Sequence, residues 1–189
     1  IDFIEGIDTE VEVIVCADRD NYATGLIQTL SNAQIGITNS DALAEYCEQT
    51  KKLIDKYADY NDKITVTYVN PEATEFYAIA TEYADYIGEG FIYGDIIVNA
   101  KVNDVERVKT VSFAQIYQFQ TNEELSYYGS YYDVTRIFAN IQKAVRFSQS
   151  NMDTPPANAD ALRRNGAQGD YRLRAYGFCA SLRQCADHL

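Results

Sequence analysis

The stretch from Asp55 to Glu72, DKYADYNDKITVTYVNPE, places a helix end, a strand and a helix-start signal next to one another. Helical spacing of apolar residues ends near Ala58, and strand alternation runs from Ile64 to Val69. Asn70-Pro71 follows at once and is typical of a helix N-terminus. A helix, a strand and a second helix in direct succession indicate an α/β domain rather than a helical bundle or an all-β sandwich.

Apolar alternation predicts three further strands. Val11 to Ala17, VEVIVCA, is apolar on both faces in its second half, as expected of a central strand. Asp95 to Ala100 and Val105 to Phe113 flank Asn103-Asp104, a turn signal. So short a connection requires these two strands to pair antiparallel.

Helical spacing is clearest from Ser40 to Ala58, where apolar residues recur every three or four positions. Ser40 is the expected N-cap of this helix. Asn70 and Pro71 are expected to start the next helix, with an apolar stripe from Phe76 to Ile87 and a stop at Gly88.

Two weaker segments complete the order. Tyr22 to Leu30 predicts a short helix in an otherwise irregular region from Asp18 to Asn39, although Gly25 lowers its helix propensity. Phe113 to Phe119 predicts a short closing helix. The resulting order, β-α-β-α-β-β-α, is that of a thioredoxin-like α/β sandwich.

The redox residues of a thioredoxin are missing from this order. Thioredoxins place a CxxC motif just after the first strand, where this chain has Ala17-Asp18-Arg19-Asp20. They also place a proline just before the third strand, where this chain has Gly94. The sequence therefore predicts a thioredoxin-like fold that lacks the CxxC motif and carries no cofactor.

The four cysteines form no CxxC pair, and their spacing fits no common zinc pattern. His188 is the single histidine. Cys16 and Cys47 fall on apolar faces, so buried free thiols are expected there, with a disulfide as the alternative. The sequence leaves the pairing of Cys179 and Cys185 open.

Asp18 and Asp20 follow the first strand with a spacing that suggests a metal site. A calcium-binding loop would continue with an acidic or amide residue and then glycine, but Tyr22 and Ala23 stand there. A solvated loop is therefore expected. The chain also contains no nucleotide-binding or hydrolase motif, so no catalytic residue is predicted.

The net charge of −12 argues against nucleic acid and anionic lipid surfaces as partners. No apolar run reaches the ~18 residues that a transmembrane helix needs. The chain begins at Ile1 rather than methionine, so it is expected to be a piece of a longer protein.

Tyrosine is abundant, with 16 Tyr and no Trp, and the segment SYYGSYYD concentrates it. Tyr127, Tyr128, Tyr131 and Tyr132 surround Gly129. Because tyrosine is amphipathic, these four residues are candidate contacts for a partner protein or a sugar. The alternative is a loop or hairpin tip whose rings lie on neighbouring structure.

Composition changes near Asn151. The remaining residues include five Arg but no Lys and no Glu, and they follow Pro155-Pro156 without clean periodicity. A basic arm, a disordered linker and a non-native end are the three interpretations. The domains expected are therefore residues 1–135, which form the α/β domain, and residues 136–189, an irregular C-terminal segment.

Four segments together resemble one family, the GldG-like auxiliary components of ABC transporters, which are linked to gliding motility. The similar segments are IDFIEGIDTEVEVIV, YADYNDKITVTYVNPE, YGDIIVNAKVNDVERVKTVSFAQIYQF and SYYGSYYDVT. They cover about residues 1–135, and the similarity ends after Thr135.

The resemblance implies an extracytoplasmic, non-enzymatic accessory domain at the bacterial cell membrane, tethered through the parent protein. It implies permease or ATPase subunits and other accessory proteins as partners, and no catalytic, cofactor or metal residues. Two alternatives from other classes are a solute-binding module, with its site at the carboxyl ends of the strands, and a thioredoxin-like redox enzyme.

Overall fold

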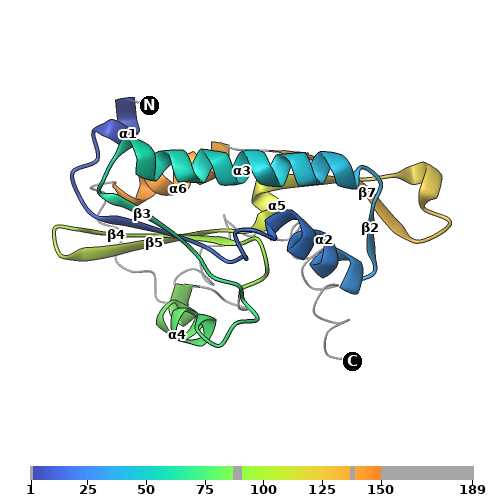
Figure 1. The fold of residues 1–189 in the computed structure, drawn as a ribbon, viewed down its shortest axis with the longest axis horizontal. Coiled ribbons are helices and arrows are strands. Elements are labelled where there is room, and N and C mark those ends of the chain that lie inside the picture. Colours follow the sequence, from blue (N-terminus) through green and yellow to red (C-terminus); the bar gives the residue numbers. More distant parts are fainter. Residues whose placement is uncertain (1, 87–90, 137–138, 150–189) are drawn as a thin grey trace, which may run out of the picture.

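The computed structural model describes residues 2–86, 91–136 and 139–149 (Figure 1). They form an α/β fold with two mixed sheets that share one core, which confirms the predicted α/β class. The helices are α1 (Asp2–Glu5), α2 (Tyr22–Asn32), α3 (Ser40–Tyr60), α4 (Phe76–Glu82), α5 (Phe113–Ile116) and α6 (Ala139–Ser148), with 3-10 turns η1 (Ala84–Tyr86) and η2 (Glu123–Leu125). The strands are β1 (Val11–Val15), β2 (Ile35–Ile37), β3 (Ile64–Tyr68), β4 (Ile96–Val102), β5 (Val105–Val111), β6 (Tyr117–Thr121) and β7 (Ser130–Arg136).

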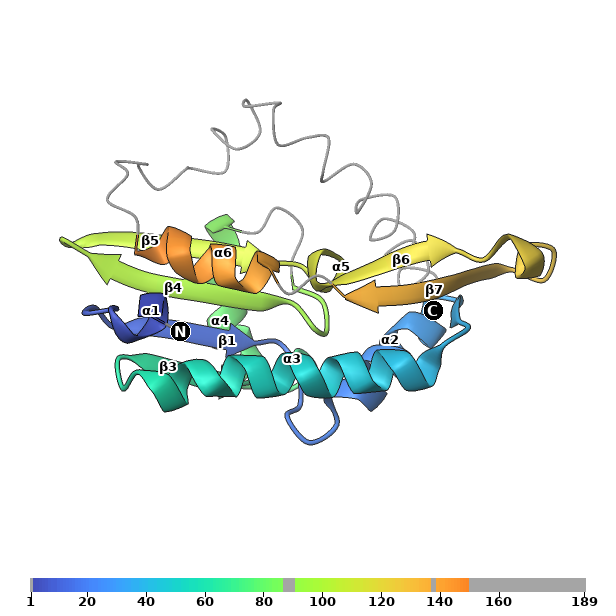
Figure 2. The same ribbon diagram turned by 90° about the horizontal axis from the view of Figure 1, so that it is seen from above.

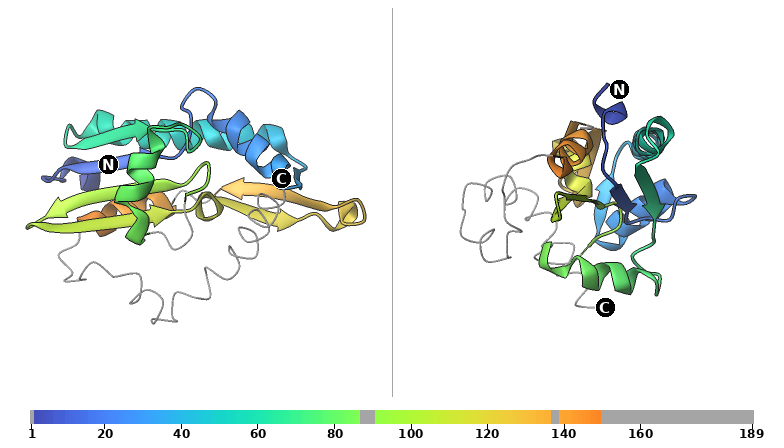
Figure 3. Two further views of the ribbon diagram at one scale, coloured as in Figure 1. Left: turned by 90° about the horizontal axis from the view of Figure 1, so that it is seen from below. Right: turned by 90° about the vertical axis from the view of Figure 1, so that its left-hand side faces the viewer.

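The larger sheet, sheet A, has the strand order β3-β1-β4-β5. β1 runs parallel to β3 and antiparallel to β4, and β4 and β5 form the predicted antiparallel hairpin. Asn103 and Asp104 both have positive φ angles, 51° and 63°, as the two-residue turn of such a hairpin requires. Helices α3 and α6 lie over one face of this sheet and α4 over the other (Figures 1 and 3).

The alternation in β1 explains why both faces of sheet A are covered. Val11, Val13 and Val15 face the main core beneath α3 and α6. Ile14 belongs to a second apolar cluster with Phe76 of α4. The central strand is therefore apolar on both faces in its second half, as predicted.

The smaller sheet, sheet B, has the order β2-β7-β6 and lies beside sheet A (Figure 2). β2 pairs parallel with β7, and β6 pairs antiparallel with β7. The prediction did not include this sheet: β2 falls in the region expected to be irregular, and β6 falls inside the predicted helix from Phe113 to Phe119. That helix ends at Ile116, where the chain turns into β6.

Two predicted helix starts are corrected. Helix α3 does contain the predicted stripe, with Leu43, Cys47 and Ile54 fully buried, but its N-cap is Asn39 rather than Ser40. The Asn39 side chain instead bonds both the N–H and the C=O of Val134 on β7, at 2.9 Å each. It therefore ties α3 to sheet B rather than capping its own helix.

Asn70 and Pro71 do not start a helix, because residues 70–75 form turns and α4 begins only at Phe76. The Asn70 side chain accepts a hydrogen bond from the N–H of Glu72 and closes a tight turn. Tyr83 of the predicted stripe is buried, whereas Ile87 and Gly88 lie outside the described residues.

Irregular structure was expected from residue 136 onward, and for residues 139–148 this expectation is wrong. They form α6, whose Ile141, Ala144 and Val145 are buried in the main core together with Val134 of β7. Their spacing of three and four residues is that of a helix. Residues 150–189, with the expected basic or disordered tail, lie outside the described residues.

Candidate functional site

The tyrosine-rich segment forms the end of the β6–β7 hairpin, which projects from the body of the molecule (Figure 1). Asn122 organises the turn: its N–H donates to the C=O of Tyr131 at 2.8 Å, and its side chain accepts from the N–H of Leu125 at 3.3 Å. The Ser126 hydroxyl donates to the C=O of Glu123 at 2.7 Å. These bonds give the tip a defined shape.

Tyr127 and Tyr128 stand on this tip and are largely free of the protein body. Their side chains are 91% and 74% exposed, and their rings contact each other edge to face with centroids 5.4 Å apart. Gly129 follows with φ +144°, a backbone conformation that other residues adopt rarely. The arrangement presents two aromatic rings to solvent on a short, ordered turn.

Tyr131 and Tyr132 have a different environment, since both lie on β7 and are only partly exposed. Tyr132 packs edge to face on Phe119, with ring centroids 6.5 Å apart. Tyr131 covers Gly36 of β2 so closely that a Cβ atom on that glycine would lie 2.3 Å from the ring. The structure therefore divides the four candidate tyrosines into an exposed pair and a pair that packs within sheet B.

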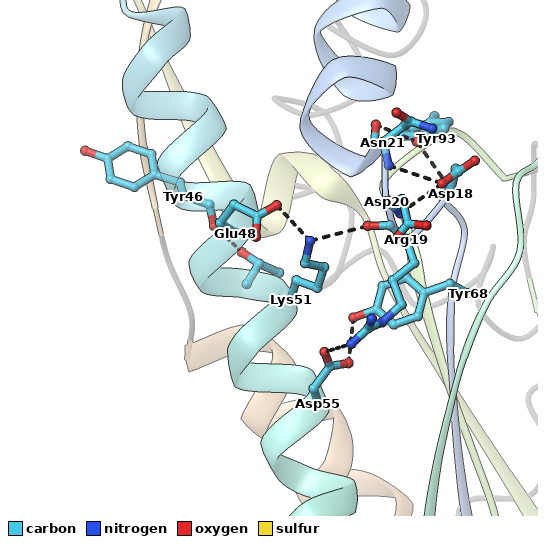
Figure 4. A network of polar contacts seen from close by, with 11 residues as sticks. Asp18, Arg19, Asp20, Asn21, Tyr46, Glu48, Lys51, Asp55, Tyr68 and Tyr93 are labelled. Atoms are coloured by element: carbon cyan, nitrogen blue, oxygen red, sulfur yellow. Dashed lines mark hydrogen bonds and ion pairs between the residues drawn. The ribbon is translucent and has the colours of Figure 1, made fainter.

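The loop after β1 holds the two aspartates that suggested a metal site (Figure 4). The Asp18 carboxylate accepts from the N–H groups of Asn21 and Asp20, at 3.1 and 2.9 Å, and these bonds hold the pKa of Asp18 below its ordinary value. The hydroxyl of Tyr93 accepts from the N–H of Asp18 and donates to the C=O of Asn21. The Asp18 side chain thus closes its own turn, and no group of acidic, cysteine or histidine side chains suited to a metal occurs among the described residues.

Arg19 of this loop lies against α3 and the end of β3. Its guanidinium pairs with the Asp55 carboxylate at 2.5 Å and lies 5.6 Å from the ring centroid of Tyr68, whose hydroxyl donates to the same carboxylate (Figure 4). Burial, followed by the negative charge of Asp55, raises the pKa of Tyr68. Lys51 of α3 bonds the C=O of Arg19 and the carboxylate of Glu48. The prediction missed this network, because its members come from three elements that only the fold brings together.

Cys16 and Cys47 are buried free thiols, as expected, and the disulfide alternative does not apply to them. Cys16 belongs to the cluster beneath α4, and Cys47 belongs to the main core on the other face of sheet A. Burial raises the pKa of Cys16 far above its ordinary value and raises the pKa of Cys47 to about 11. Burial therefore disfavours the thiolate form, the reactive one, at both cysteines.

Three buried hydroxyl groups meet where the two sheets join. The Tyr117 hydroxyl on β6 lies 3.2 Å from that of Tyr22 on α2 and 3.0 Å from that of Thr50 on α3. All three residues are fully or almost fully buried. Hydroxyl groups that satisfy one another in this way are structural, because each would be costly to bury alone.

Comparisons of the chain with protein-family models, with curated proteins and with solved structures gave no match. Within the described part of the chain, no helix has both the length and the apolar character needed to cross a membrane. The interpretation of function therefore depends on the exposed features of the fold.

Proposed function

We propose that this chain is an extracytoplasmic, non-enzymatic accessory domain of an ABC-type transport system, of the GldG-like kind, whose parent protein is anchored in the membrane. It acts through protein contacts, and Tyr127 and Tyr128 make the central ones. The observation that carries the proposal is the exposure of these two rings, 91% and 74%, on an ordered tip. Exposed aromatic side chains held in place are typical anchors of protein interfaces, since little conformational entropy is lost when they bind.

We also propose that sheet A and its helices are thioredoxin-like. The strand order β3-β1-β4-β5, with β1 parallel to β3 and antiparallel to β4, supports this relationship. The position of α4 on the face opposite α3 and α6 supports it as well (Figure 3). The β6–β7 hairpin and β2 then form an addition to that core.

The surroundings of the β1 end favour binding over catalysis. A thioredoxin-like redox enzyme needs a thiolate there, whereas the loop has Asp18, Arg19 and Asp20, and the two described cysteines are buried with raised pKa values. A solute-binding module needs polar groups that are not already hydrogen-bonded within the protein and can bind a ligand. Here the Asp18 and Asp55 carboxylates are already bonded within the protein.

The first test is the genome: genes for an ABC permease and ATPase beside the gene for this protein are expected. The second test is co-purification of the full-length parent protein with these two subunits from detergent-solubilised membranes. Changing Tyr127→Ser and Tyr128→Ser together is expected to lower the recovery of the subunits at least ~10-fold, as for interface hot spots.

Tyr77→Ser is the matched control, because Tyr77 is 78% exposed on α4, away from the hairpin. Both variants should keep the melting temperature of the wild type, since they replace exposed side chains. If the Tyr127/Tyr128 variant and the Tyr77 variant recover the subunits equally well, the hairpin tip is not the contact. If the neighbouring genes encode no transporter, the transport role itself is wrong.

A further inference from the structure

Positive charge gathers on β5 and α6, in a chain whose net charge is −12. The two elements, VERVKTV and ANIQKAVRFS, contain Arg107, Lys109, Lys143 and Arg146 but only one acid, Glu106. Four cations and one acid give these two elements a formal charge of +3. Helix α6 packs over β4 and β5 (Figure 2), so the two elements that carry these cations adjoin each other.

β5 is also an edge strand of sheet A. Val102 and Val105 pair across the two-residue turn and exchange backbone hydrogen bonds. The direction of the backbone groups alternates along β5, so those of Arg107 and Lys109 also point toward β4. The N–H and C=O groups of Glu106, Val108 and Thr110 then point away from the sheet. Among the described residues, no further strand pairs with this edge, so it can accept one.

Arg107 of this edge strand is a buried charged residue. Arg107 pairs with Ala100, which faces the main core, so its side chain is on the same face as α6. It is only 5% exposed, and its Nε has no hydrogen-bond partner among the described residues. A buried cation without a carboxylate partner is costly, and a carboxylate placed beside it would remove much of that cost. Within the described ranges, the chain thus provides neither a fifth strand for this edge nor a hydrogen-bond partner for the Nε of Arg107.

A second copy of this chain is a poor occupant. Two β5 strands that pair antiparallel about Val108 would place Arg107 of each copy opposite Lys109 of the other, and pairing about Arg107 would place it opposite itself. Like charges directly opposite each other destabilise a sheet. The partner strand that fits is acidic.

We infer that the open edge of β5 binds an acidic, extended segment of a partner protein, which adds as a fifth strand to sheet A. Acidic residues at every second position of that segment face α6, opposite Arg107 and Lys109. This surface is on sheet A, whereas the tyrosine tip is on sheet B, so the inference does not depend on the proposed transport role.

The experiment measures binding of labelled octapeptides to the full chain by fluorescence anisotropy. The probe, TEVETEVT, carries its glutamates on one face of an extended strand. TKVKTKVT reverses the charge, and a TEVETEVT peptide with N-methyl groups on alternate amides removes the backbone donors that pair with β5. Only unmodified TEVETEVT is expected to bind.

Lys109→Glu is expected to weaken TEVETEVT binding about fivefold to tenfold, from the reversal of one cross-strand charge pair. Thr110→Pro is expected to abolish binding, because it removes an outward N–H while leaving the bonds to β4 in place. Lys56→Glu, an equal change of charge on an exposed position of α3, is the matched control and should bind as the wild type does. Thermal melting confirms that each variant is folded.

Equal binding of the N-methylated peptide would overturn strand addition, because the interaction would then be electrostatic only. Equal binding of TKVKTKVT would overturn the acidic specificity. Absence of binding by all three peptides, or unchanged binding to both the Lys109 and Thr110 variants, would overturn the site. None of these outcomes bears on the co-purification test of the tyrosine tip.

Discussion

Gly25 lies in the second turn of α2, where glycine ordinarily weakens a helix, and replacing it with alanine ordinarily stabilises one. In this protein we expect Gly25→Ala to destabilise. A Cβ atom on Gly25 would lie 2.2 Å from both Cζ and Oη of Tyr93, well inside van der Waals contact. Tyr93 cannot easily move away, because it is buried and its hydroxyl bonds the backbone of Asp18 and Asn21.

The magnitude follows from three opposing contributions. The added methyl group gains about 1 kcal/mol of helix propensity. Overpacking costs about 1–3 kcal/mol, and the two Tyr93 hydrogen bonds contribute about 1 kcal/mol each if they are lost. The net expectation is a loss of about 2 kcal/mol in the free energy of unfolding. For a domain of this size, that loss lowers the melting temperature by ~4–8 °C.

The assay is thermal and urea unfolding followed by circular dichroism. Thr24→Ala is the matched control, since Thr24 is exposed on the same helix and its replacement should change stability little. In a Tyr93→Leu background the obstruction is absent, so Gly25→Ala should become neutral or stabilising by up to about 1 kcal/mol. A higher melting temperature for Gly25→Ala in the wild-type background would refute the close contact with Tyr93.

Three further predictions concern the core. Tyr117→Phe should lower the free energy of unfolding by about 1–3 kcal/mol, because it leaves the Tyr22 and Thr50 hydroxyls without their shared partner. Tyr60→Phe, at an exposed position, is the control. Equal urea midpoints for the two variants would contradict the hydroxyl cluster. The free energy of unfolding should decrease as pH rises from 9.0 to about 11, because the Cys47 thiol ionises at lower pH in the unfolded chain than in the folded one. In the Cys47→Ala variant this decrease should be smaller. Deleting residues 151–189 should leave a cooperative thermal transition, because α6 already closes the core, and a lost transition would show that the tail belongs to the fold.

Local patterns predicted the parts of the fold whose partners are close in sequence. The stripe of α3, the alternation of β1 and the Asn103-Asp104 turn each depend on interactions within a few residues, and each is confirmed. The α/β class followed from them. The thioredoxin-like topology within that class, and every functional assignment, stay predictions.

Sheet B could not be predicted in the same way, because its pairings are distant in sequence. β2 has three residues and exists because Ile35–Ile37 pair with residues 130–132 of β7. Tyr117 follows a helical turn and becomes a strand residue because it pairs with Arg136. In the candidate tyrosine segment, the sequence could not distinguish the exposed pair from the packed pair, since both are Tyr-Tyr beside Gly129 or Ser130.

The distribution of satisfied and unsatisfied groups is what favours a binding role for this fold. At the β1 end, where an enzyme on such a scaffold would act, Asp18 and Arg19 are occupied by contacts within the protein. The candidate binding features lie elsewhere among the described residues: the exposed rings of Tyr127 and Tyr128 on sheet B, and the edge strand β5 with the Nε of the buried Arg107 on sheet A. Exposed aromatic rings and an open basic edge are complementary to other chains rather than to a reacting substrate. On this distribution of contacts we base the proposal that the domain binds other proteins.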